Sequence, residues 1–223
     1  MVVEGATENV VIRGLLAAHL GARGIFIAPK IIGKATGKGG HVTFDRTVGD
    51  VFDLYRQEPT AVITTFIDFY GRSGDWPGEN AHGPNTSPEI ADRLQLELEN
   101  GVRVRAGGNG PKINFIPYIQ VHGLEAILFA QPAILAGVFG QPTKEPEIAA
   151  VSAGLDSCED INDNPQTAPS KRIEAIFGEY KKGRGQRSHA RVYAERAELA
   201  EIRSRCPRFH AWVERLEAVG GST

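Results

Sequence analysis

Short apolar segments alternate with helical segments along the first ~130 residues, and this alternation restricts the chain to few folds. The segments rich in β-branched and aromatic residues are 1–3, 24–29, 61–68 and 114–123. Pro117 restricts the last of these to an edge or a bulge. Strands separated by helices favour a parallel sheet, because the helical crossover returns the chain in the same direction. We therefore predict an α/β protein whose parallel sheet is flanked by helices.

Helical patterns occupy the intervals between these strands. The predicted helices cover residues 7–20, 50–57, 88–100 and 125–129. Thr7 is expected to cap the first helix, with Glu8 in its favourable first turn. Gly101 is expected to end the third, since glycine commonly follows the last helical residue.

The pattern changes after residue ~140, where no further strand is expected. Helices are predicted at 144–153, 170–178, 191–204 and 208–218. A chain of 223 residues can form one well-packed domain or a domain with an appendage. We predict an α/β domain over 1–135 and a helical appendage over 136–223 that packs on it.

Composition excludes some classes of protein. A formal charge of −2 gives no bulk attraction to nucleic acid, so such binding would need a local basic strip or a metal. Cys158 and Cys206 have neither CxxC nor paired-histidine spacing, which argues for buried thiols in a reducing compartment rather than zinc. No apolar run approaches the ~18–20 residues of a membrane span and no charged leader is visible, so we expect a cytoplasmic protein.

Acidic residues and a histidine follow the predicted strands. Glu4 follows the first strand, Asp68 ends the third and His122 ends the fourth. Close behind them come Glu8, Asp75 and Glu125. In open α/β sheets sites lie at the carboxyl ends of the strands, where clustered carboxylates need a shared proton or a cation such as Mg²⁺. Taken singly, Glu8 is better explained as a first-turn helix charge, and Asp75 and Glu125 as solvated acids.

Basic and aromatic side chains offer contacts for a phosphate backbone. The loop GKATGKGG at 33–40 lacks the spacing of a phosphate-binding P-loop, but Lys34 and Lys38 could contact nucleic acid or simply be solvated. The same two readings apply to Lys171 and Arg172 in TAPSKR. Tyr70 could stack on a base or pack at the rim of the core.

Several motifs together resemble a known family. They are VEGATE at 3–8, TTFIDFYG at 64–71, FIPYIQVHGLEAILF at 115–129 and TAPSKRI at 167–173. This combination resembles a prokaryotic Toprim-like family of unknown function, related to the Toprim domains of overcoming-lysogenization-defect nucleases. Members are often encoded beside an AAA or ABC-type ATPase in defence loci. The likeness covers nearly the whole chain.

The resemblance implies a Toprim-like, Rossmannoid domain and a Mg²⁺- or Mn²⁺-dependent nuclease acting on DNA or RNA. Glu4 matches the metal-binding glutamate and Asp68 the first acid of an Asp-x-Asp pair. Tyr70 stands at the second acid, so Asp75 or Glu125 would have to replace it, and Gly123 stands where the family usually has an acid.

The remaining roles follow from the same reading. Glu8 would assist catalysis, Lys171 would steady the scissile phosphate, and His122 and Arg172 would contact substrate. An ATPase is the expected partner, and a homo-oligomer is possible. The alternative is a catalytically weak module that binds nucleic acid or nucleotide and regulates the ATPase; a hydrolase of small phosphoesters is a third reading.

Overall fold

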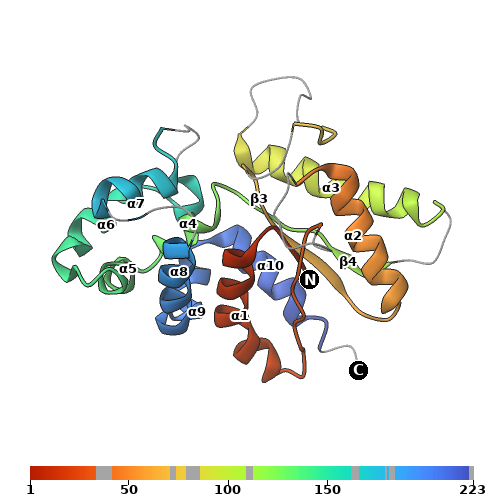
Figure 1. Ribbon diagram of the computed structural model, residues 1–223, viewed down its shortest axis with the longest axis horizontal. Helices are drawn as coiled ribbons and strands as arrows, with labels where there is room; N and C mark the ends of the chain where they lie inside the picture. Colours follow the sequence, from red (N-terminus) through yellow and green to blue (C-terminus); the bar gives the residue numbers. More distant parts are fainter. Residues whose placement is uncertain are drawn as a thin grey trace. The chain divides into compact units, whose positions relative to one another are not determined.

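The computed structural model describes residues 1–33, 42–70, 74–78, 86–108, 113–161, 166–178, 180 and 184–220 (Figure 1). Packing within the chain defines two units. Unit 1 holds Met1–Gly5 and Ala28–Val121, and unit 2 holds Ala6–Ile27 and His122–Thr223. These limits do not coincide with the boundary expected after residue 135, because Ala6–Ile27 and residues 122–135 group with the C-terminal helices.

Unit 1 is built on a parallel sheet, which confirms the predicted α/β class. Its strands are β1 (Val2–Val3), β2 (Lys30–Ile31), β3 (Ile63–Asp68), β4 (Phe115–Ile116) and β5 (Ile119–Gln120). β1 lies between β2 and β3, while β4 and β5 both pair with β3, and these pairings are all parallel. Val2 and Val3 lie beside Thr65 and Phe66, so β1 and β3 end at the same edge of the sheet.

The strand predicted at 24–29 is wrong, since β2 begins only at Lys30. Residues 25–29 have no strand conformation and the Phe26 side chain is 87% exposed. Pro29 cannot donate to a neighbouring strand, whereas the backbone nitrogens of Lys30 and Ile32 donate to the carbonyls of Met1 and Val3 at 2.8 and 2.9 Å. The apolar run alone was therefore a poor guide to the pairing.

The strand predicted at 114–123 is present as two short pieces. β4 and β5 flank Pro117 and Tyr118, and both add to the side of β3 opposite β1. This position agrees with the expectation that Pro117 lies at an edge or an interruption of the sheet.

Two helices of unit 1 pack against each other and against the sheet. They are α2 (Phe44–Gln57) and α3 (Ser87–Arg105), seen in orange and yellow-green in Figure 1. Thr43 caps α2 by accepting from the backbone nitrogen of Arg46. Thr86 and Glu89 form a capping box at the start of α3, in which each side chain accepts from the other residue's backbone nitrogen.

Gly101 does not end α3, contrary to the prediction, and the helix continues to Arg105. A Cβ atom at position 101 would lie 2.8 Å from Cζ of Phe44 and 2.9 Å from Cγ2 of Val48, both on α2. Glycine therefore allows the two helices to approach closely, which is a packing role rather than a capping role.

Unit 2 is helical, as predicted for the C-terminal part of the chain. Its helices are α1 (Ala6–Gly21), α4 (Leu124–Leu128), α5 (Pro132–Val138), α6 (Glu145–Val151), α7 (Pro169–Phe177), α8 (Arg184–Arg196), α9 (Leu199–Arg205) and α10 (Pro207–Glu217), with single turns η1 (Pro142–Lys144) and η2 (Cys158–Asp160). Helix α5 was not predicted. The helix predicted over 191–204 is instead two, since α8 ends at Arg196 and α9 begins at Leu199.

Helices α1 and α8 form a close pair within unit 2. A Cβ atom at Gly14 would lie only 2.7 Å from Cβ of Ala194. The buried face of α1 consists of Val11, Ile12, Leu15, Leu16 and Leu20. This apolar face recurs every three to four residues, as expected for a helix that packs on a core.

Both cysteines lie in unit 2 and are free and buried, as the sequence led us to expect. Burial of the two thiols agrees with a packing role. Within the described ranges, no helix has the length and apolar character needed to span a membrane.

Candidate functional site

Glu4 and Asp68 lie together at one edge of the sheet of unit 1. Glu4 follows β1, and Asp68 is the last residue of the neighbouring strand β3. The backbone nitrogen of Asp68 donates to Oε2 of Glu4 at 3.2 Å, and both side chains are half-buried. The structure thus brings together the two acids that the sequence placed at strand ends.

The turn after β3 is closed by Asp68 itself. Its Oδ1 accepts from the backbone nitrogen of Tyr70 at 2.8 Å, which is the geometry of an Asx turn. The Tyr70 side chain is 43% exposed, and its ring meets that of Phe69 edge to face. The position at which the resemblance expects a second acid therefore presents an exposed phenol.

Asp75 has a local structural role in unit 1. Its Oδ2 accepts from the backbone nitrogen of Phe44 at 3.2 Å, which satisfies a donor in the first turn of α2. An exposed aspartate near a helix N-terminus is also favoured by the helix dipole. These contacts explain Asp75 without a metal.

Two carboxylates are enough for one kind of metal site. Mg²⁺ is usually held by one or two carboxylates, with water and substrate phosphate oxygens completing an octahedron. Glu4 and Asp68 supply that donor set. No group of three or more His, Cys, Asp or Glu side chains suited to a metal is found among the residues that the structure describes.

Glu125 belongs to unit 2 and is a buried carboxylate with protein partners. It is 6% exposed, and Oε1 accepts from the hydroxyl of Tyr180 at 2.8 Å and from Nε2 of Gln186 at 2.7 Å. Burial, and then the charge of Glu125, raise the pKa of Tyr180 above its ordinary value. The phenol therefore stays protonated and donates a hydrogen bond to Glu125. Glu125 therefore anchors Tyr180 and Gln186, a role that the sequence did not reveal.

His122 and Gly123 both have positive φ angles. His122 is 4% exposed with φ of 60°, and Gly123 follows with φ of 80° and ψ of 170°. The second conformation is essentially restricted to glycine. This accounts for Gly123 at a position where the resemblance expects an acid, because an acidic side chain would strain the turn that leads into α4.

The remaining predicted residues of unit 2 lie on helices. Glu8 is half-buried in the first turn of α1. On α7, Lys171 pairs with Glu174 at 2.7 Å, and Nε of Arg172 donates to the carbonyl of Thr167 at 2.9 Å. Exposed pairs of this kind contribute little to stability, so Lys171 can exchange its partner.

The predicted basic loop is only partly described. Lys34 and Lys38 lie outside the described residues. Lys30, in β2 before the loop, forms an ion pair with Asp50 at 3.2 Å, and Oδ2 of Asp50 accepts from the backbone nitrogen of Gly33 at 2.8 Å.

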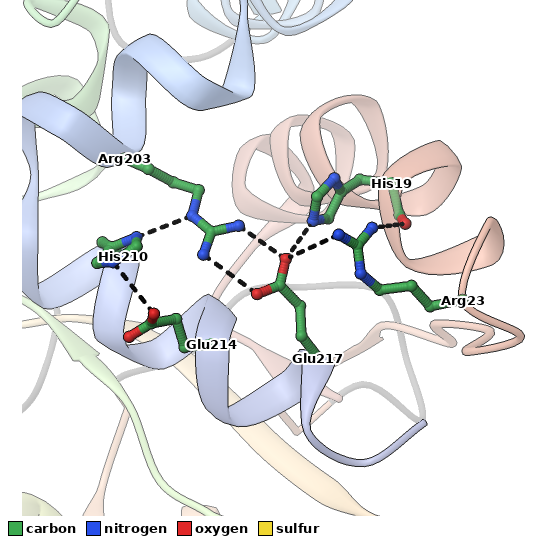
Figure 2. A network of polar contacts seen from close by, with 6 residues as sticks. All are labelled: His19, Arg23, Arg203, His210, Glu214 and Glu217. Carbon is green, nitrogen blue, oxygen red and sulfur yellow. Dashed lines mark hydrogen bonds and ion pairs between the residues drawn. The ribbon is translucent and has the colours of Figure 1, made fainter. Parts of the chain in front are cut away.

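A polar network in unit 2 was missed by the sequence analysis (Figure 2). Arg203 donates through both Nη atoms to Glu217, and His19 meets the same carboxylate from another helix. His19 and Glu217 are 198 positions apart, whereas the pairs His19–Arg23 and His210–Glu214 have the four-residue spacing of a helix. No local pattern could have revealed the rest.

Comparison with known proteins gives one match. No match was found among curated proteins or among solved structures. A family model described as a domain of unknown function, DUF4276, matches residues 3–217. Because this match extends over parts of both units and nearly all of the 223 residues, the chain belongs to the DUF4276 family.

Proposed function

We propose that this chain is a Mg²⁺- or Mn²⁺-dependent nuclease with a Toprim-like site. The observation that carries the proposal is the adjacency of Glu4 and Asp68, which follow and end neighbouring parallel strands. Carboxyl ends of strands are where open α/β sheets place their ligands. Two acids at the ends of neighbouring strands suit a hard cation that also takes phosphate oxygens.

The proposed roles of the residues rest on the strand-end position of the two acids and on the family resemblance. Glu4 and Asp68 would hold the ion. When bound, it would polarise a phosphoryl oxygen and activate water for attack on phosphorus. Lys171, which forms an exposed pair with Glu174, is the candidate to neutralise charge on the phosphate. Glu8 is the remaining candidate for a base.

The wider setting of the proposal comes from the family resemblance. We propose DNA or RNA as substrate, a cytoplasmic location, and an AAA or ABC-type ATPase as the partner that controls cleavage. Lys34, Lys38, Tyr70, His122 and Arg172 are the candidates for substrate contacts.

Charge-removing variants of the two acids test the metal site. Glu4→Gln keeps an oxygen for the nitrogen of Asp68, and Asp68→Asn keeps one for the nitrogen of Tyr70, so both variants should fold. We expect each to weaken Mn²⁺ binding by at least ~10-fold in calorimetry, since even second-shell losses reach that size. Cleavage of single- and double-stranded DNA and RNA should disappear with the affinity.

Asp53→Asn is the matched control for these variants. Asp53 is an exposed acid on α2 of the same unit, and its side chain forms no hydrogen bond among the described residues. It should bind and cleave like the parent chain. Full Mn²⁺ affinity and cleavage in the Glu4 and Asp68 variants would rule out the proposed site.

A regulatory binding module is the second candidate, and a specific observation favours it. Tyr70 stands at the position of the second acid. Asp75, one possible substitute, already accepts from the backbone nitrogen of Phe44 in the first turn of α2. Metal and nucleic-acid binding that depends on Glu4 and Asp68, without cleavage alone or with the ATPase, would support this module over the nuclease.

A further inference from the structure

A cavity of about 610 Å³ lies within unit 2, between the end of α1 and the elbow formed by α9 and α10. Its polar wall carries His19, Arg203 and His210, one from each of these helices. No acidic side chain is among the residues that line it, within the part of the chain that the structure describes. The polar part of the wall therefore consists of basic side chains and the hydroxyl of Ser204.

A carboxylate behind the wall holds these donors in place (Figure 2). Glu217 accepts from Nη1 and Nη2 of Arg203 at 2.7 and 3.1 Å, and Nε2 of His19 lies 2.5 Å from its Oε1. Arg203 is only 16% exposed and Glu217 18%. A guanidinium fixed by a bidentate carboxylate loses little further freedom when it binds a ligand.

Arg203 keeps donors beyond those that Glu217 uses. Its Nε donates to Nδ1 of His210 at 2.9 Å, so three of the five guanidinium N–H groups are engaged and two remain in the described structure. Since Nδ1 of His210 accepts, its proton lies on Nε2, which is 3.4 Å from Glu214 in a pair too long for a firm hydrogen bond. His19 has Nδ1 on the side of its ring away from Glu217 (Figure 2).

Apart from Ser204, the remaining lining of the cavity is apolar. Leu199 and Ala200 of α9 and Pro207 of α10 line it. Cavities of ~300–1,000 Å³ accept ligands of drug or cofactor size, so this one is too large for a bare inorganic anion. It offers room for an organic body beside the nitrogen donors.

We propose that this cavity binds an organic phosphate monoester, with the phosphate on Arg203, His19 and His210 and the organic body on Leu199, Ala200 and Pro207. A monoester has three terminal oxygens, which can accept from the two remaining N–H groups of Arg203 and from Nε2 of His210, while a P–OH group can donate to Nδ1 of His19. A carboxylate has only two oxygens in a plane. This assignment concerns unit 2 and does not depend on the metal site at Glu4 and Asp68.

Phenyl phosphate is the probe for the test, with inorganic phosphate, phenol and benzoate as partial mimics. Titration calorimetry at one ionic strength should give a Kd for phenyl phosphate at least 10-fold lower than for any of the three. Nitrogen-15 spectra of the imidazoles should show the signals of His19 and His210 moving during the same titration.

Ala200→Trp separates binding in this cavity from binding elsewhere. The exposed Ala200 lines the cavity without joining the polar network, so an indole there fills the space and leaves the network intact. Phenyl phosphate affinity should fall at least 10-fold. Ala175→Trp, at an exposed position on α7, is the control and should bind like the parent chain.

Arg203→Lys tests the phosphate end. Lysine keeps the charge beside Glu217 but not the planar fork, so phenyl phosphate affinity should fall while phenol binding is unchanged. Equal affinity for phenyl phosphate and inorganic phosphate, benzoate binding as tightly as phenyl phosphate, or full affinity in Ala200→Trp would each overturn the proposal.

Discussion

At the scale of single residues, Glu217 shows how a surface network can be linked to pH. Hydrogen bonds from Arg203, and then from His19, lower the pKa of Glu217 from 4.5 to about 2. The folded pKa lies below the unfolded one, so the network stabilises the fold fully above about pH 4.5. This contribution is lost as the pH falls from there towards 2.

Glu217→Gln should therefore flatten the acid side of the stability curve. At pH 7 the variant should lose about 1–3 kcal/mol of unfolding free energy, because Arg203 keeps its charge without its partner. Its stability should then fall less than that of the parent between pH 5 and 3. Urea unfolding at a series of pH values measures both effects.

Glu214→Gln provides the comparison for this variant. Glu214 lies on the same helix, but its side chain is 58% exposed and its ion pair with His210, at 3.4 Å, is long. Its replacement should leave the acid slope unchanged. An equal slope in the parent and Glu217→Gln would remove the assigned role of the network.

The roles of some candidate-site residues could be predicted from the sequence, and those of others could not. Glu4 and Asp68 could be found because each follows or ends an apolar strand, and adjacent parallel strands end at one edge. The contacts of Glu125 with Tyr180 and Gln186 span 55 and 61 positions, and such pairings leave no local pattern. Gly123 was explained only by its backbone angles.

At the scale of elements, the contact between α2 and α3 depends on a glycine. Gly101→Ala should destabilise unit 1 by about 1–3 kcal/mol, since the new methyl group would press on Phe44 and Val48. Thermal and urea unfolding of the purified variant measure this loss.

Gly49→Ala is the matched substitution on the facing helix. A Cβ there meets nothing closer than 3.8 Å, at Arg105. Alanine is favoured over glycine inside a helix by about 1 kcal/mol, so this variant should be as stable as the parent or more so. If both alanine variants gain stability, the helices do not approach as closely as described.

Helices were predicted more accurately than strands, because most of the strands are too short to show a hydrophobic period. β1, β2, β4 and β5 have two residues each, too few to show a period, whereas β3 has six and was found at its place. Helix ends were displaced where tertiary contacts decide them, as at Gly101. The break between α8 and α9 has no glycine or proline to mark it.

At the scale of the whole molecule, the two units are interleaved in sequence. Residues 6–27 belong to unit 2, although residues 1–5 before them and 28–121 after them belong to unit 1. The alternation of strands and helices predicted the fold class but not this division, because it does not say which helix packs where. Helix α1, which has a buried apolar face, packs against α8 within unit 2.

A fragment of residues 1–135 should consequently fail to form a native state. It contains α1 but lacks α8, so the apolar face of α1 would be uncovered. We expect strong binding of the dye ANS and weak near-ultraviolet circular dichroism, compared with the full chain. Added residues 136–223 should restore both signals; a fragment that is native alone would support the boundary after residue 135.

The pairing of Gly14 with Ala194 also sets a delay during synthesis. The two positions are 180 residues apart in the chain (194 − 14). A Cβ atom at Gly14 would lie 2.7 Å from Cβ of Ala194, so the two backbones are in close contact. Ribosomes add ~5–20 residues per second, so α1 would wait about 10–40 s for its partner to emerge. During that interval a nascent chain would carry a helix with an uncovered apolar face, which is the kind of segment that chaperones bind.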